Sequence, residues 1–496
     1  MNKSKFILSL FFLVIFSFLI GCSGSHTIEE NNFTILQNKI QQKFNDPRFQ
    51  DAHWGVLIKS LETGKIWYEQ NDEKLFMPAS NEKILTASAA LCTLGPDFKF
   101  ETYLTHSGEI KDSTLDGNII VFGNGDPTLY NRFYLDPCEV FNGWADTLVS
   151  KGIKVITGDI IGDDNAFDDD PLGYGWSFDG LDVWYSAEVG ALQLNENYVD
   201  LEIVPPQTND DSLKIIPNLP SDYFKIFNET IVVDTGKNDI TIQRPFGSND
   251  IYVSGFVVRG SHQFEYSPSI HNPTLLYVTV LQEVFEKHGI KVNGNPVDCD
   301  SIPLWFHKHE DFNFLILHKS PPLKDILTGM MKRSQNLYAE TFARTLGWKE
   351  FGLGSFKNGK KIVEQVLENK FDIPPKTYAY MDGSGLSRYD YVSPDEIVKI
   401  LEGMTTNKYW DVWFNALPVA GVDGTLKNRM KGTLVEGNVH AKTGTISNVR
   451  GLSGYVTTLD GEKLVFSFLV NGHLRTSKET EEITDTVLEM LASFKR

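Results

Sequence analysis

The stretch Met-Pro-Ala-Ser-Asn-Glu-Lys-Ile-Leu-Thr-Ala-Ser-Ala-Ala-Leu, residues 77–91, places a serine and a lysine at the start of an apolar segment. Pro78 is typical of a helix entry and the apolar residues after it recur at helical spacing, so we predict a helix that starts near Ser80 and runs into the core. Residues three apart on a helix are neighbours, so the amine of Lys83 can reach the hydroxyl of Ser80. Ser80 is therefore a candidate nucleophile and Lys83 its candidate base, because a serine hydroxyl needs activation to react.

The S-x-x-K spacing alone is weak evidence, since a serine in front of a helix is more often a cap. Two further motifs favour the interpretation of Ser80 as a nucleophile over that of a helix cap. Residues 334–336 supply an S-x-N motif and residues 442–444 supply K-T-G. The three motifs follow the order found in penicillin-recognising serine acyl-transferases, and three partial motifs in that order rarely arise by chance.

Composition limits the remaining classes of protein. With 496 residues, 41% hydrophobic and 22% charged, the chain can bury a sizeable core, and its length favours two or three domains. The formal net charge of −19 argues against a nucleic-acid partner, because close approach to a phosphate backbone normally uses a basic face.

The N-terminus has the pattern of an export signal. Lys3 and Lys5 precede an apolar run over residues 6–20 that is too short for a comfortable membrane span. The run ends in Leu-Ile-Gly-Cys, which resembles a bacterial lipobox; the alternative is an ordinary signal peptide with a chance cysteine. We expect a lipoprotein signal peptide over residues 1–22 with lipidation at Cys22, and therefore an exported protein anchored to a bacterial membrane and facing the periplasm.

Three cysteines besides Cys22 allow at most one disulfide, and the sequence leaves open a bond between Cys138 and Cys299. Cys92 is expected to be a buried thiol. The histidines do not form ligand spacings such as H-E-x-x-H, so we predict no metal and no cofactor.

The order of hydrophobic patterns indicates a mixed α and β chain. We expect a polar tether over residues 23–32, an amphipathic helix from about residue 33 to 44 and a hairpin over residues 53–68. From about residue 98 to 299 short strands and turns dominate, with one helix over residues 273–288. Strands predicted within residues 437–470 alternate as antiparallel neighbours, and a last amphipathic helix is expected to pack on that sheet with the first one.

Taken together, these motifs resemble the D-alanyl-D-alanine carboxypeptidase/endopeptidases, the class C low-molecular-mass penicillin-binding proteins. The resemblance covers nearly the whole mature chain. It rests on six runs: Pro78–Lys83, Gly123–Pro127, Ser334–Glu340, Asp382–Arg388, Leu417–Thr425 and Ala441–Thr445.

The resemblance implies an α+β fold: a penicillin-recognising, transpeptidase-like domain, with an antiparallel sheet packed against helices, that carries a large β-rich insertion. About 250 positions separate Lys83 from Ser334, far more than in smaller relatives. We therefore expect a discontinuous catalytic domain over residues 33–99 and 300–496, and an inserted module of one or two subdomains over residues 100–299.

The resemblance also implies roles for residues. Ser80 would attack the carbonyl between two D-alanines, with Lys83 accepting its proton, and water would hydrolyse the acyl-enzyme. Ser334 would relay the proton to the leaving amine, and Asn336 would hold the peptide carbonyl of the substrate. β-Lactams would act as covalent inhibitors.

Lys442, Thr443 and Gly444 would form the site for the terminal carboxylate, and the backbone N–H groups of Ser80 and Thr445 would form the oxyanion hole. Asp163 matches loosely a position where relatives bind the amino group of the peptide stem. An Asx turn through residues 163–165 is the alternative for that residue.

Two other functions remain open on the sequence. A β-lactamase or esterase would use the same constellation and would differ in rapid deacylation. A peptidoglycan-binding lipoprotein that lost catalysis would also keep the cleft, but all of the expected catalytic side chains are present, which favours the peptidase.

Overall fold

The computed structural model describes residues 32–208, 211–305 and 312–496. The predicted signal peptide, the lipidated Cys22 and nearly all of the tether lie outside these residues. The described residues divide into two compact units: those within 32–76, 393–402 and 417–496 form the first, and those within 77–392 and 403–416 form the second. Along the described ranges, no helix combines the length and the apolarity that a membrane crossing requires.

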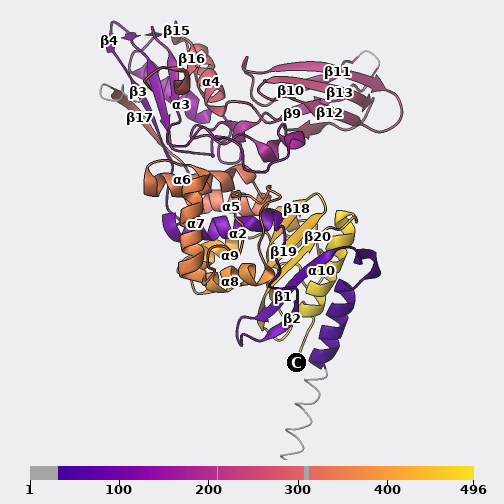
Figure 1. The fold of residues 1–496 in the computed structure, drawn as a ribbon. Helices are drawn as coiled ribbons and strands as arrows, with labels where there is room; N and C mark the ends of the chain where they lie inside the picture. Colours follow the sequence, from indigo (N-terminus) through magenta and orange to yellow (C-terminus); the bar gives the residue numbers. More distant parts are fainter. Residues whose placement is uncertain (1–31, 209–210, 306–311) are drawn as a thin grey trace, which may run out of the picture. The chain divides into compact units, whose positions relative to one another are not determined.

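The first unit is built on a five-stranded sheet in the order β18-β19-β20-β1-β2 (Figure 1). Its strands are β1 (His53–Ser60), β2 (Ile66–Gln70), β18 (His440–Ile446), β19 (Val449–Thr457) and β20 (Lys463–Asn471). Every pairing is antiparallel, which confirms the predicted hairpin and the predicted antiparallel C-terminal strands. β18 is an edge strand of this sheet.

Two helices contribute to the first core, which also includes buried residues of the segment over residues 420–439. The helix over residues 32–44 and α10 (Ser477–Ala492) contribute to one buried cluster with the sheet. Ile40 and Phe44 come from the first helix, Val487 from α10, and Phe468 from the central strand β20. The predicted packing of both helices on the sheet is confirmed.

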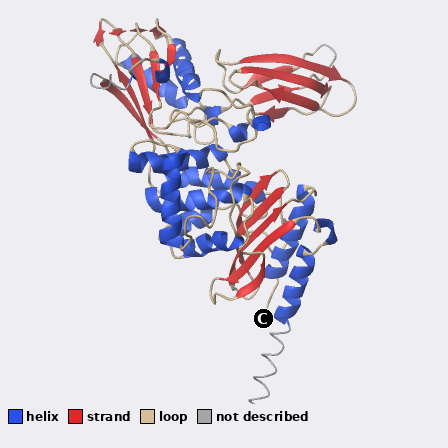
Figure 2. Ribbon diagram, viewed as in Figure 1, coloured by secondary structure: helices blue, strands red, loops and turns tan. Residues whose placement is uncertain are grey.

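The helical part of the second unit surrounds α2 (Lys83–Leu94), which follows a 3-10 turn over Ala79–Glu82. Residues 83–91 are all buried, so α2 is a central helix rather than an amphipathic one. It contacts α5 (Leu323–Arg333), α6 (Asn336–Phe351) and α7 (Phe356–Phe371) (Figure 2). α9 (Trp410–Ala416) packs on α5, and α8 (Pro394–Thr405) crosses the boundary between the units.

The rest of the second unit is rich in short strands, as its sequence pattern indicates, and its described residues form four sheets. One sheet runs β16-β8-β6-β3-β17, with strands Pro296–Asp298, Ile160–Asp163, Ile119–Gly123, Glu101–His106 and Asn313–Lys319. The second runs β15-β7-β5-β4, with strands Lys291–Val292, Val155–Ile156, Thr114–Asp116 and Glu109–Lys111. The third runs β10-β9-β14, over Lys214–Pro217, Leu201–Val204 and Phe264–Tyr266, and the fourth runs β11-β13-β12, over Lys225–Val233, Asp250–Val258 and Asp239–Gln243.

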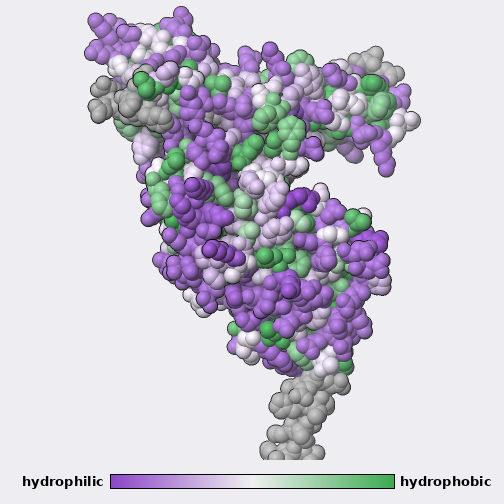
Figure 3. Space-filling model, viewed as in Figure 1, coloured by the Kyte–Doolittle hydropathy of each residue, from purple (hydrophilic) through white to green (hydrophobic). Residues whose placement is uncertain are grey.

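Helices α3 (Glu139–Ser150) and α4 (Pro273–Lys287) pack against each other and share one buried cluster with these strands. The predicted helix over residues 273–288 is confirmed to within one residue, and the side chain of Asn272 caps it by accepting from the backbone N–H of Leu275. That residues 100–299 are a separately inserted module stays a prediction. Hydrophilic side chains cover most of the face shown in Figure 3, in keeping with the high net charge.

Candidate active site

Ser80 and Lys83 form the hydrogen-bonded pair that their spacing predicts. Ser80 lies half-buried in the 3-10 turn before α2, and Lys83 is the completely buried first residue of α2. Lys83 Nζ donates to Ser80 Oγ across 2.9 Å. A buried amine beside a partly accessible hydroxyl is the arrangement that an activated serine nucleophile requires.

The same amine binds two further segments of the second unit. Lys83 Nζ donates to Asn336 Oδ1 across 2.6 Å and to the backbone carbonyl of Ser384 across 2.7 Å. The S-x-x-K motif, the S-x-N motif and the loop over residues 382–388 therefore meet at one nitrogen atom. All three runs belong to the set that carries the resemblance, but no contact between Lys83 and the loop over residues 382–388 was predicted from the sequence.

Burial changes the basicity of Lys83. Removal from water lowers the pKa of its amine to about 7, although the buried carboxyl groups of Asp382, Glu340 and Asp390 oppose this shift. Near neutral pH a large share of the molecules therefore carries an uncharged Lys83. An uncharged amine 2.9 Å from a hydroxyl can accept its proton, so the structure gives Lys83 the properties of a general base.

The turn between α5 and α6 holds the S-x-N motif. Ser334 ends α5 in the left-handed conformation, with φ 61°, and Asn336 is the first residue of α6. The Asn336 amide is oriented at both ends, because its Nδ2 donates to the backbone carbonyl of Tyr185 across 2.7 Å while its Oδ1 accepts from Lys83. Asn336 is therefore fixed with its carbonyl oxygen toward the catalytic amine.

The loop over residues 382–388 is organised around the buried carboxylate of Asp382. This carboxylate accepts from the backbone N–H groups of Ser384 (2.9 Å), Gly385 (2.5 Å) and Ser387 (2.6 Å), and from Trp176 Nε1 (2.8 Å). The network fixes the carbonyl of Ser384, which accepts from Lys83. An aspartate followed by Gly-Ser-Gly is a signal for such a turn, and sequence reasoning did not use it.

The backbone in front of the nucleophile is strained and closely packed. Ala79 has a φ of 48°, in the left-handed region that residues with a Cβ rarely adopt. A Cβ on Gly385 would lie 1.8 Å from the carbonyl oxygen of Ala79, and Gly385 itself has a φ of 80°. Only glycine at position 385 lets this loop pack directly on the backbone that presents Ser80.

The K-T-G motif lies on β18 in the first unit. Lys442 is buried and its Nζ donates to the carbonyl of Thr443 across 2.9 Å, while Thr443 Oγ1 donates to Thr425 Oγ1 across 2.8 Å. Gly444 is buried, and Thr445 is exposed. That these residues share a cleft with Ser80, which belongs to the second unit, stays a prediction.

Asp163 ends β8 as a buried residue whose oxygens are hydrogen-bonded within the protein. Its Oδ1 accepts from the backbone N–H and the side-chain amide of Asn165, at 3.1 and 3.0 Å, and its Oδ2 accepts from Trp305 Nε1 at 2.5 Å. The Asx turn offered as the alternative from the sequence is thus present. The role of Asp163 in binding substrate stays a prediction.

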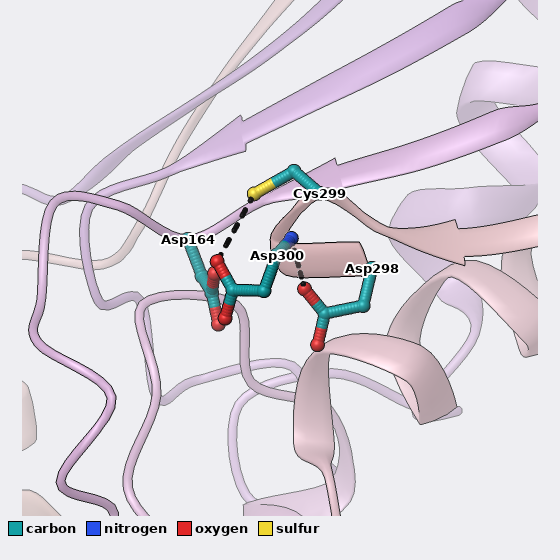
Figure 4. Close-up of side chains that lie close together, drawn as sticks. All are labelled: Asp164, Asp298, Cys299 and Asp300. Carbon is teal, nitrogen blue, oxygen red and sulfur yellow. Dashed lines mark hydrogen bonds between the residues drawn. The ribbon is translucent and has the colours of Figure 1, made fainter. Parts of the chain in front are cut away.

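Cys92, Cys138 and Cys299 are free thiols, so the disulfide left open on the sequence is not formed. Cys299 lies beside three acids, and the ligand atoms of Asp164, Asp298, Cys299 and Asp300 are all within 4.8 Å of one another (Figure 4). Asp298 already accepts from the backbone N–H of Asp300, and Asp164 accepts from Thr274. Acidic groups arranged in this way are common without an ion, and we assign no metal to them.

A partly accessible serine hydroxyl bonded to a buried lysine of lowered pKa defines a serine acyl-transfer site of the S-x-x-K class. Comparisons with known proteins agree with this class. A family model described as the D-Ala-D-Ala carboxypeptidase 3 (S13) family matches residues 36–493. A D-alanyl-D-alanine carboxypeptidase from an Actinomadura species is 32% identical over 458 residues, covering 89% of this chain and 81% of that protein.

Solved structures extend the similarity to the fold. The crystal structure of penicillin-binding protein 4 from Haemophilus influenzae has 27% sequence identity and a TM-score of 0.78, and the alignment covers 92% of this chain and 99% of that one. A complex of the same protein with a β-lactam has a TM-score of 0.72 at 26% identity, covering 93% of this chain and 100% of that one.

The chain belongs to the D-Ala-D-Ala carboxypeptidase family, the S13 family of serine hydrolases. The predictions of the family, of the penicillin-recognising α+β fold and of an enzyme are confirmed.

Proposed function

We propose that this protein is a serine D,D-peptidase that cleaves the bond after a D-alanine in peptidoglycan peptides through an acyl-enzyme on Ser80. The observation that carries the proposal is the 2.9 Å hydrogen bond between Lys83 Nζ and Ser80 Oγ, made by an amine whose pKa is lowered to about 7. Membership of the family supplies the substrate class.

The groups that would carry out acylation belong to the second unit. Uncharged Lys83 takes the proton of Ser80 as Oγ attacks the carbonyl of the penultimate D-alanine. The peptide bond breaks as the proton held by Lys83 passes through the Ser334 hydroxyl to the departing amine, and Asn336 holds a peptide carbonyl of the substrate through its amide. Water then hydrolyses the ester and restores the Ser80 hydroxyl.

The first unit would supply the recognition of the substrate carboxylate. Lys442 and Thr443 offer one cation and one hydroxyl, the pair that a carboxylate needs. Gly444 and Thr445 lie on β18, whose position at the edge of its sheet leaves backbone groups available to a ligand. The backbone N–H groups of Ser80 and Thr445 would hold the oxyanion, and loss of one such donor typically costs about two orders of magnitude in rate.

We also propose that Cys22 carries a lipid and holds the enzyme on a bacterial membrane, facing the periplasm, where its substrate lies. The lipobox-like end of the apolar run supports this. When membranes of expressing cells are extracted with a phase-separating detergent, the wild-type protein is expected in the detergent phase. The Cys22→Ser variant is expected in the aqueous phase. A wild-type protein found wholly in the aqueous phase would contradict the anchor.

Release of D-alanine from a pentapeptide muropeptide tests the enzymatic proposal. The wild type should release D-alanine, whereas Ser80→Ala should release none while unfolding at a similar temperature. Tight binding of the muropeptide by the wild type without any cleavage would instead support a binding lipoprotein. Rapid turnover of penicillin with no release of D-alanine would support a β-lactamase.

A further inference from the structure

Glu196 is a buried carboxylate at the centre of a hydrogen-bond network in the second unit. It is 1% exposed. Arg132 donates to it through Nε at 2.7 Å and Nη2 at 3.2 Å, and the hydroxyls of Tyr198 and Tyr338 donate at 2.6 and 2.5 Å. A fifth donor is the side-chain amide of Gln335. One carboxylate therefore receives five hydrogen bonds, and Arg132 balances its charge.

The backbone that carries Glu196 is held in an unfavourable conformation. Asn195, Glu196 and Asn197 have consecutive φ values of 54°, 53° and 57°, and none of them is glycine. Side-chain hydrogen bonds secure the segment, because Asn195 Nδ2 donates to the carbonyl of Tyr198 at 2.6 Å and Asn197 Nδ2 donates to the carbonyl of Glu188 at 2.8 Å. Such strain persists only where the surroundings determine the conformation strongly, as they do here.

Two of the five donors flank the S-x-N asparagine. Gln335 directly precedes Asn336, and Tyr338 follows it by two residues, so Glu196 binds the first turn of α6 on both sides of Asn336. The position of this turn sets the 2.6 Å contact between Asn336 Oδ1 and Lys83 Nζ. A displaced turn would therefore move Asn336 away from the catalytic amine.

We propose that Glu196 is a positioning residue for the acylation step, acting through Gln335 and Tyr338 on the turn that carries Ser334 and Asn336. It follows that the amide at position 335 is required in this chain, because an acid there would place a second carboxylate against Glu196. The inference rests on the proposed function, since acylation of Ser80 is its readout.

The test uses the full chain and a fluorescent penicillin, and separates the acylation rate constant at saturation from the affinity of the noncovalent complex. Glu196→Gln should lower the rate constant about tenfold, the size of effect expected from disturbing a coupled network. Glu188→Gln is the matched control. The carboxylate of Glu188 is also buried, and Glu188 lies eight residues before Glu196 in the sequence. It binds different groups, namely His271 Nδ1 and the backbone N–H of Asn272, each at 2.9 Å. That variant should acylate at the wild-type rate.

Exchanging the side chains at positions 196 and 335 distinguishes a loss of positioning from general damage to the fold. Gln335→Glu alone should acylate slowly, whereas Glu196→Gln combined with Gln335→Glu restores one amide facing one carboxylate. The acylation rate constant of the double variant should be about tenfold higher than the value obtained by multiplying the effects of the two single variants. If Glu196→Gln does not fold, Tyr338→Phe removes one donor but keeps the ring, and should lower the rate constant in a protein that still unfolds cooperatively.

Equal acylation rates for Glu196→Gln and wild type would overturn the inference. An equal loss of acylation rate in Glu188→Gln would also overturn it. So would a double variant whose rate constant is simply the product of the two single effects. A wild type that is not acylated at all would contradict the proposed function, and this outcome is distinct from the other three.

Discussion

Lys83 Nζ lies 2.6 Å from Asn336 Oδ1, although 253 positions separate the two residues in the sequence. This contact joins the start of α2 to the start of α6. It brings the S-x-x-K and S-x-N motifs together around one buried amine.

The acylation rate should depend on pH through Lys83. Its pKa is lowered to about 7 because the amine is buried, and only the uncharged amine can accept the proton of Ser80. We expect the rate of penicillin acylation to fall about tenfold per pH unit below pH 7 and to level off above it. Stopped-flow labelling between pH 5 and 10 measures this limb. A rate that keeps rising to pH 10 would mean an amine of ordinary pKa.

The same shift should affect stability. Between about pH 7 and 10.5 the unfolded chain binds a proton at Lys83 that the folded chain does not bind, so folding becomes more favourable as the pH rises. Compared with Lys83→Met, the unfolding free energy of the wild type should increase by about 1.4 kcal/mol per pH unit in this window. Below pH 7 the difference should be constant. Urea unfolding of both proteins at pH 6, 7.5 and 9 measures it.

Asn336→Asp should raise the pKa of Lys83. The variant places a carboxylate where a neutral oxygen lies 2.6 Å from the amine, and a nearby negative charge stabilises the ammonium form. We expect the acid limb of the acylation profile to move to higher pH by one unit or more. Asn336→Ala, which removes the oxygen without adding charge, should lower the rate without that upward shift. An unchanged limb in Asn336→Asp would show that the two groups do not interact in solution.

Gly385→Ala should damage the site more than a comparable glycine substitution does. The new Cβ would lie 1.8 Å from the carbonyl of Ala79, next to the nucleophile. Gly352 has a similar φ of 77° but open space around its Cβ position, so Gly352→Ala should cost only the backbone strain, about 1 kcal/mol. We expect Gly385→Ala to lose most penicillin labelling and to melt at a lower temperature than Gly352→Ala. Equal labelling and equal melting temperatures for the two variants would mean that the close packing of Gly385 on Ala79 contributes neither to activity nor to stability.

Local patterns predicted the parts of the fold and site that depend on neighbours in sequence. The spacing of Ser80 and Lys83 predicted their contact, and alternation predicted the antiparallel strands around β20. The contact of Lys83 with the Ser384 carbonyl depends on long-range packing that one sequence does not encode visibly. Glu196 was missed because three left-handed residues without glycine leave no local signal, and because its partners lie in distant segments.

The most direct measurement of the central claim is the mass of the intact protein after exposure to penicillin, followed by peptide mapping. We expect the wild type to gain the mass of one penicillin, the adduct to map to Ser80, and folded Ser80→Ala to gain none. An adduct on another residue, or a folded wild type of unchanged mass at every time point, would contradict this claim.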